Sequence, residues 1–168
     1  MKQIKAHIAV SLDGFIATSD NELEWLPSEI KSILNKQYAI ADTLLMGANP
    51  YHYIFEHWGG WPYKDKQTFV VSHHNTNITS ECGVKFLTSR QLEEIYQLKH
   101  KTDLLVVGGG ILISTLIKAR LIDNITIYIV PKLLGNGIKL FFETLNWDLK
   151  FIESNTLENG TICLNYLL

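Results

Sequence analysis

Short apolar runs alternate with amphipathic stretches along most of the chain. The runs are four to seven residues long and rich in valine, isoleucine and leucine, which is typical of strands buried on both faces of a sheet. We therefore predict a buried strand at each of six places: 4–10, 43–46, 68–72, 84–87, 104–107 and 125–130.

Helical periodicity fills the segments between these runs. We predict helices over 28–40, from Asn49, from Ser89 and over 111–120. Ser28 and Asn49 are the expected N-caps of the first two helices, because their side-chain oxygens can accept a hydrogen bond from a free backbone N–H. In the third helix, Leu92, Ile95 and Tyr96 are expected to share one face.

The last 20 residues predict a β-hairpin that turns at residues 158–160, which read Glu-Asn-Gly. Strands that alternate with helices indicate a mostly parallel sheet with helices on both faces, and the hairpin would add antiparallel edge strands. The expected fold class is α/β, with three layers (α/β/α) around a mixed sheet. A length of 168 residues fits one domain over 1–168.

Composition and charge exclude several classes of function. Apolar residues make up 46% of the chain and charged residues 19%, as in ordinary globular proteins. The 15 basic residues are balanced by 17 acidic ones, so the chain lacks the basic field that nucleic-acid binding needs. No long apolar segment predicts a membrane span, and Cys82 and Cys163 lack the spacing of a disulfide framework. We expect a cytoplasmic protein with neither a nucleic-acid nor a membrane partner.

The strongest local pattern is the glycine run at residues 108–110, between a strand and a helix. Bare backbone N–H groups at a helix N-terminus attract an anion, and glycine allows a pyrophosphate to approach them closely. The alternative is a tight strand-to-helix turn without a ligand. Open α/β sheets bind ligands beyond the carboxyl ends of their strands, and the strands ending at Gly47 and Ser72 would add two more such ends.

Polar residues follow the strand that ends at Ser72. His73 and His74 could receive the far phosphate of a dinucleotide, and the alternative is a solvated loop. Neighbouring residues of an extended chain point to opposite sides, so these two histidines do not predict a metal site.

The segment before the first helix carries a candidate acid. Glu29 falls in the first helical turn beside Trp25 and Ile30, where partial shielding would raise its pKa enough to handle a proton. The alternative is a glutamate that only interacts with the helix dipole. The aromatic loop at 58–62 either forms a wall for a flat heterocycle or covers the core.

Several of these segments together resemble the dihydrofolate reductase-like superfamily, in the branch of the C-terminal reductase domain of the bifunctional riboflavin-biosynthesis deaminase-reductase. Residues 11–17 match the pattern S-x-D-G-x-I-A, and 131–141 are close to P-x-L-L-G-x-G-x-P-L-F. Residues 45–47, 70–72 and 107–110 resemble the strand ends of that family's cofactor site. The resemblance covers nearly the whole chain.

This resemblance implies an NADPH-dependent reductase that acts on a pteridine- or pyrimidine-type heterocycle and forms a homodimer. Glu29 would be the catalytic acid. The implied substrate-binding residues are Asp13, Trp25, Glu29 and Tyr51. The implied cofactor-binding residues are Ala9, Ile16, Gly47, Ala48, Asn49, Ser72, His73, His74, Gly108, Gly109, Gly110, Ile111 and Leu112.

The chain departs from the dihydrofolate reductase pattern directly after Gly47. Those enzymes carry a basic residue and a threonine there, where this chain has Ala48 and Pro50. Three hypotheses follow: a reductase of dihydrofolate-like substrates, a reductase of an aminopyrimidine with an opened ribose chain, and a non-catalytic relative that binds a nucleotide or a partner.

Overall fold

A computed structural model describes residues 2–72, 83–88, 92–142 and 145–168. Its strands, in chain order, are β1 (Ile4–Ser11), β2 (Phe15–Ala17), β3 (Thr43–Gly47), β4 (Gln67–Ser72), β5 (Val84–Thr88), β6 (Leu104–Gly108), β7 (Asn124–Val130), β8 (Ile138–Lys139), β9 (Lys150–Thr156) and β10 (Ile162–Leu167). All six predicted buried strands and the terminal hairpin are confirmed. The sequence did not predict β2 and β8, because strands of three and two residues are too short to show an alternating pattern.

The helices are α1 (Ser28–Ile40), α2 (Ala48–His57), α3 (Leu92–Lys99) and α4 (Gly110–Lys118). Both predicted N-caps are wrong. The caps are Pro27 and Gly47, and neither helix has a side-chain cap hydrogen bond. The chain enters the first helix directly from Pro27 and the second directly from the end of β3, so Ser28 and Asn49 already lie inside the first turn. The predicted start of the third helix, Ser89, lies outside the described residues.

The two later helices also differ in detail from the expectation. In α3, Ile95 is buried, but Tyr96 is 45% exposed and does not share its face. The last helix begins at Gly110 and ends at Lys118, and Arg120 follows it in the left-handed region with φ of 58°.

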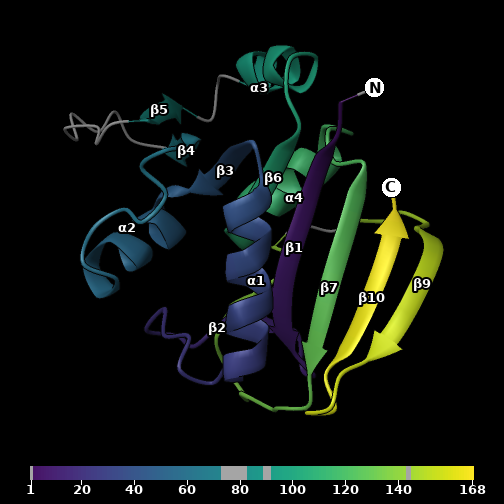
Figure 1. Ribbon diagram of the computed structural model, residues 1–168. Helices are drawn as coiled ribbons and strands as arrows, with labels where there is room; N and C mark the ends of the chain where they lie inside the picture. Colours follow the sequence, from purple (N-terminus) through teal and green to yellow (C-terminus); the bar gives the residue numbers. More distant parts are fainter. Residues whose placement is uncertain (1, 73–82, 89–91, 143–144) are drawn as a thin grey trace.

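The main sheet has eight strands in the order β5-β4-β3-β6-β1-β7-β10-β9 (Figure 1). The first six are parallel to one another, and β10 and β9 form an antiparallel edge beside β7. A second, small sheet pairs β2 with β8. The α/β fold with a mostly parallel mixed sheet is therefore confirmed.

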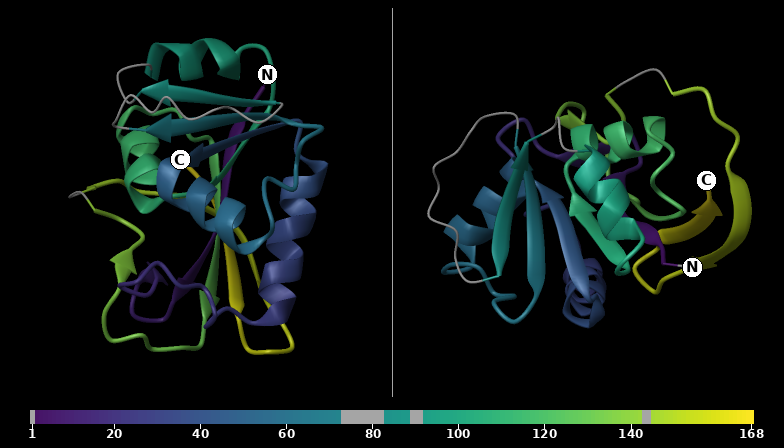
Figure 2. Two further views of the ribbon diagram at one scale, coloured as in Figure 1. Left: turned by 90° about the vertical axis from the view of Figure 1, so that its left-hand side faces the viewer. Right: turned by 90° about the horizontal axis from the view of Figure 1, so that it is seen from above.

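Helices cover both faces of the sheet (Figures 1 and 2). One core packs α1 and α2 against the sheet, and its fully buried members include Ile30, Leu44 and Met46. The other packs α3 and α4 against the opposite face around Ile4 and Ile113. The sheet is thus the middle of three layers, as expected.

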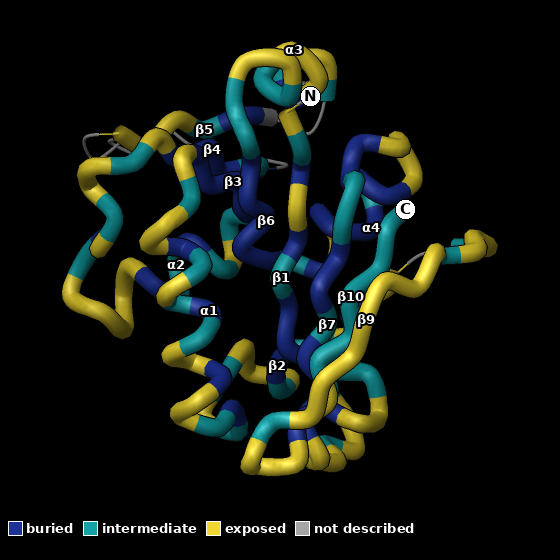
Figure 3. The backbone as a smooth tube through the Cα atoms, turned by 45° about the vertical axis from the view of Figure 1, so that its right-hand side comes forward, coloured by how far each residue is buried: buried dark blue, intermediate teal, exposed yellow. Residues whose placement is uncertain are grey.

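The antiparallel edge, β10 and β9, continues the middle layer on the far side of β7. Every residue of β9 is exposed, as Figure 3 shows by its yellow colour. Phe151 in β9 and Ile162 in β10 are 55% and 42% exposed, so this edge carries apolar side chains on the surface. Within the described part of the chain, no helix has the length and apolar character needed to cross a bilayer.

Candidate active site

A pocket of about 620 Å³ lies at the carboxyl ends of the central parallel strands. Residues from the ends of β3, β4 and β6 line it, together with the first turns of α2 and α4. The strand order reverses here, because β4 and β5 follow β3 toward one edge of the sheet whereas β6, the next strand along the chain, lies on the other side of β3. Such a switch point is where open α/β sheets bind their ligands.

Two helix N-termini meet at the centre of this pocket. Gly47 precedes α2 and Gly109 precedes α4, and both glycines line the pocket. A Cβ atom on Gly109 would lie 3.6 Å from the Cα of Gly47, so the two turns are in contact. Neither helix has a side-chain cap hydrogen bond. The free N–H groups and the two helix dipoles therefore favour an anion at this position.

Glycine is needed at residues 108–110 for two different structural reasons. Gly108 and Gly109 have positive φ of 147° and 96°, which other residues rarely adopt. A Cβ on Gly110 would lie 2.6 Å from the carbonyl oxygens of both Lys139 and Leu140. Gly110 is thus required by the packing of the chain after β8 onto the start of α4. Its expected contact with a cofactor stays a prediction.

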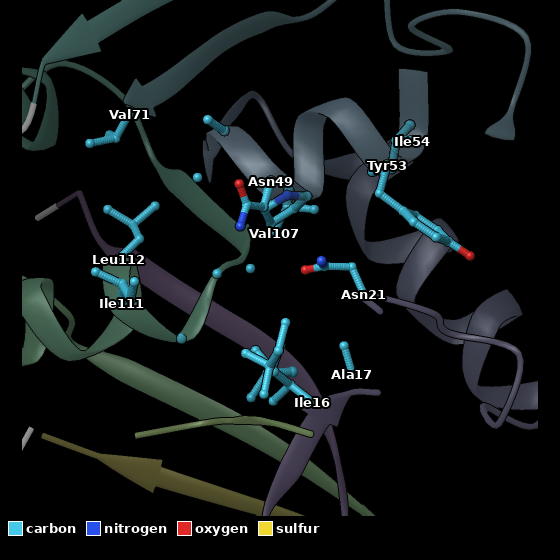
Figure 4. A pocket seen from close by; sticks show the side chains of 18 of the residues that line it. Ile16, Ala17, Asn21, Asn49, Tyr53, Ile54, Val71, Val107, Ile111 and Leu112 are labelled. Atoms are coloured by element: carbon cyan, nitrogen blue, oxygen red, sulfur yellow. The ribbon is translucent and has the colours of Figure 1, made fainter. Parts of the chain in front are cut away.

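One end of the pocket is a slot between β4, α3 and α4. Val71 and Ser72 at the end of β4, Ile95 of α3, and Ile111 and Leu112 of α4 line this slot. Figure 4 shows Val71, Ile111 and Leu112 grouped at this end. The slot offers apolar surface for a flat ring. His73 and His74, which were expected here, lie outside the described residues.

The other end of the pocket is formed by α1, α2 and the small sheet. Ile16 and Ala17 of β2 line it, and Ile138 of β8 lies beside them. The carboxamides of Asn21 and Asn49 point into the pocket from the loop before α1 and from α2 (Figure 4). This end therefore combines apolar walls with two hydrogen-bonding side chains.

Charge at this end comes from α1. Lys31, Asn35 and Tyr38 recur at helical spacing and line the pocket. Among the described residues that line it, Lys31 carries the single formal charge, and no carboxylate is present. The Tyr38 hydroxyl donates a hydrogen bond to the Val107 carbonyl oxygen at 3.3 Å, and burial raises the pKa of this phenol. The electrostatics of this end favour an anionic ligand.

The predicted cofactor residues largely come together. Ile16, Ser72 and the residues at the two helix N-termini all line the pocket, and their binding of a cofactor stays a prediction. Ala9 is buried in the core beneath α1 and does not line it, because its side chain points to the opposite face of the strand from Ile8, which does. Sequence reasoning missed Lys31, Asn21 and Asn35, which no local motif distinguishes.

The predicted substrate residues lie elsewhere. Glu29 is exposed and is not among the residues that line the pocket, and Trp25 packs against the α1 side of the core. Tyr51 is 2% exposed and packs its ring 5.3 Å from that of Trp61, centroid to centroid. A binding or catalytic role for these three residues stays a prediction.

Asp13 also lies outside the pocket lining. Its carboxylate accepts hydrogen bonds from Ser11 Oγ at 2.6 Å and from the backbone N–H groups of Leu134 and Gly135 at 3.1 and 2.7 Å. These bonds, the one from Ser11 above all, lower the pKa of Asp13 to about 2. In the aromatic loop, Trp58 lines the pocket whereas Trp61 is buried in the core, and contact of Trp58 with a heterocycle stays a prediction.

Comparisons with known proteins agree with this architecture. The family model described as RibD C-terminal domain matches residues 2–163. The protein YwjB of Bacillus subtilis is 30% identical over 145 residues, which cover 83% of each chain. The riboflavin biosynthesis protein RibD of Mycobacterium tuberculosis is 25% identical, over 86% of this chain but 49% of its own length.

Solved structures show the same fold. A putative riboflavin biosynthesis protein from Shewanella sp. PV-4 superposes with a TM-score of 0.79 at 28% identity, over 98% of both chains. Dihydrofolate reductase from Enterococcus faecalis, complexed with NADP(H), superposes with a TM-score of 0.71 at 18% identity, over 98% of this chain and 95% of the enzyme. The fold is therefore dihydrofolate reductase-like, and the chain belongs to the RibD C-terminal domain family.

Proposed function

We propose that this protein is an NADPH-dependent reductase whose substrate is a pyrimidine-type heterocycle with an anionic group. The observation that carries the proposal is the distribution of charge along one continuous pocket. Two uncapped helix N-termini lie at its centre, and Lys31 lies at the α1 end with no carboxylate among the described lining residues.

The pocket suits a dinucleotide in three respects. The glycine turns leave room for a pyrophosphate beside free backbone N–H groups. The slot between Val71, Ile111 and Leu112 offers apolar surface for the adenine ring. The opposite end leaves space lined by Ile16 and Ile138 for the nicotinamide and the substrate. The chemistry that NADPH supplies when bound is a hydride from its nicotinamide ring.

The residues of the α1 end favour a pyrimidine over a pterin. A pterin-type substrate needs a carboxylate for its amidine edge, and the candidate Glu29 is exposed and outside the lining. A phosphorylated aminopyrimidine needs a cation, and Lys31 supplies one beside the carboxamides of Asn21 and Asn35.

Cofactor binding is tested first, by titration with NADPH and NADH while tryptophan fluorescence is recorded. Trp58 lines the pocket and is 42% exposed, so Trp58→Phe is expected to remove most of the quenching. Trp147→Phe is the control, because Trp147 packs under the Arg120 guanidinium, away from the pocket lining. Absence of binding by both cofactors would refute the proposal and favour a non-catalytic relative.

Substrate class is tested by turnover of dihydrofolate and of a phosphorylated ribosylaminopyrimidine. Lys31→Met is expected to raise KM for the phosphorylated substrate at least about tenfold, because a charge-assisted hydrogen bond is lost, and to leave NADPH affinity unchanged. Glu29→Gln separates the two substrate classes, because turnover stays intact with a pyrimidine-type substrate and falls strongly if Glu29 is the acid of a pterin-type reductase. The reverse result would be an unchanged KM in Lys31→Met and a loss of turnover in Glu29→Gln. It would identify a pterin-type reductase with Glu29 as its acid.

A further inference from the structure

A segment that closes one side of the pocket is hydrogen-bonded both to the turn after β1 and to α4, where the Ser114 hydroxyl accepts from the Phe142 N–H at 3.3 Å. We refer to residues 131–142, which contain β8, as the β8 segment. Its Ile138 and Phe142 line the pocket. Its backbone also packs on the first residue of α4, since the carbonyl oxygens of Lys139 and Leu140 lie 2.6 Å from the position that a Cβ of Gly110 would take. The position of this segment therefore affects both the pocket wall and the α4 N-terminus.

Most of the attachment of the β8 segment runs through the turn between β1 and β2. The Leu12 N–H donates to the Lys132 carbonyl oxygen at 2.9 Å, and the Leu140 N–H donates to the Gly14 carbonyl oxygen at 3.1 Å. Between these two hydrogen bonds, the side chain of Asp13 connects the turn after β1 to the β8 segment. Its Oδ2 accepts from the N–H groups of Gly135 at 2.7 Å and Leu134 at 3.1 Å.

The carboxylate of Asp13 is itself oriented by a buried serine. Ser11 is 1% exposed, and its hydroxyl donates to Asp13 Oδ1 at 2.6 Å while accepting from the Phe15 N–H at 2.9 Å. Ser11 thereby fixes both the side chain of Asp13 and the first residue of β2. Both carboxylate oxygens are engaged, so the geometry is that of an anchor and not of a group waiting for substrate.

We propose that Asp13 is a positioning residue, which holds the β8 segment against the pocket and thereby fixes the N-terminus of α4 at the dinucleotide end. It acts through Leu134 and Gly135 on the segment, and through Lys139 and Leu140 on Gly110. The inference rests on the proposed function for the part that concerns NADPH, and on the hydrogen bonds alone for the part that concerns the segment.

The variants Asp13→Ala and Asp13→Asn separate anchoring from simple loss of charge. Alanine removes every acceptor, whereas asparagine keeps one oxygen for Gly135 and Leu134 and a polar group for Ser11. Asp20→Ala is the matched control, because Asp20 is an exposed carboxylate of the following loop for which the described structure gives no hydrogen bond. The carboxylate of Asp13 stays ionised at ordinary pH, so substitution rather than titration is the useful perturbation.

Two readouts are measured on each folded variant. The first is amide hydrogen exchange at Leu134 and Gly135, which report the anchor, and at Ile113, whose N–H donates to the Gly109 carbonyl oxygen and reports the start of α4. The second readout is the Kd for NADPH, measured together with the KM for NADPH and the kcat at saturation. Asp13→Ala is expected to speed exchange at all three amides at least tenfold. It is expected to raise the Kd and KM for NADPH at least tenfold, with kcat at saturation within threefold of wild type.

Asp13→Asn is expected to stay within threefold of wild type in Kd, and Asp20→Ala to match wild type in every measurement. Unchanged exchange at Leu134 and Gly135 in Asp13→Ala would refute the anchor. Faster exchange there, with Ile113 and the NADPH Kd unchanged, would refute positioning of α4. If wild type itself does not bind NADPH, the proposed function fails, and the exchange at Ile113 still decides whether Asp13 fixes the helix.

Discussion

The stability of this protein is expected to fall steeply in mild acid because of His7. The side chain lies on β1, half-buried, with Nδ1 at 3.1 Å from the hydroxyl oxygen of Tyr128. Burial, with a smaller contribution from the charge of Lys5, lowers the pKa of His7 from 6.5 to about 4. The unfolded chain therefore binds a proton at a pH where the folded protein does not, and protonation favours unfolding.

The magnitude follows from the two pKa values. The contribution of His7 is complete above pH 6.5 and is lost as the pH falls toward about 4. At pH 5, protonation of His7 raises the equilibrium constant for unfolding about 30-fold. This corresponds to a loss of about 2 kcal/mol in the free energy of unfolding.

The assay is urea denaturation followed by tryptophan fluorescence at pH 7.5 and pH 5. His7→Gln removes the titrating ring but keeps an oxygen that can accept from the Tyr128 hydroxyl. Between the two pH values, wild type is expected to lose about 2 kcal/mol more stability than this variant. His100→Gln, at an exposed ring beyond α3, is expected to lose as much as wild type. Equal losses in wild type and His7→Gln would refute the reasoning.

Three further predictions concern backbone, core and assembly. Gly137→Ala is expected to destabilise the fold by at least about 2 kcal/mol in thermal or urea unfolding, because its φ is 150° and a Cβ would collide with the Ala17 carbonyl oxygen. Ile30→Ala is expected to cost about 3 kcal/mol by the same assay, since Ile30 is fully buried on the core-facing side of α1. Analytical ultracentrifugation is expected to give twice the chain mass, with Phe151 and Ile162 covered in a homodimer. Ile162→Lys is then expected to give the monomer, and a wild-type monomer would contradict the implied homodimer.

The sheet could be predicted from the sequence because buried parallel strands are continuous apolar runs. The glycine run was informative for a similar reason, since a strand that ends in glycine before a helix permits few geometries. The antiparallel pair β2 and β8 gave no such pattern. In this pair Phe15 lies opposite Lys139, and a pairing between residues so far apart in the sequence is set by tertiary packing.

The site was harder to predict, because a shift of one residue along a helix or strand changes the direction in which the side chain points. On α1 each step turns the side chain by about 100°, so Lys31 lines the pocket while its neighbour Ile30 faces the core. In β1 the alternation places Ile8 at the pocket and Ala9 on the other face. The motif around Asp13 implied substrate binding, which stays a prediction, and it gave no sign of the anchoring contacts, because the amides that Asp13 binds are 121 and 122 residues away.

The position of β1 in the sheet has a consequence for how the chain folds. Ile4 pairs with Leu104 on one side and Lys5 with Asn124 on the other, so both neighbours of this strand come about a hundred residues later. During synthesis, β1 would leave the ribosome with two unsatisfied edges and wait until β6 and β7 have been made. Such non-local pairing slows folding and prolongs the time in which an apolar strand is open to other chains. We expect nascent chains that stop before residue 104 to depend on chaperones.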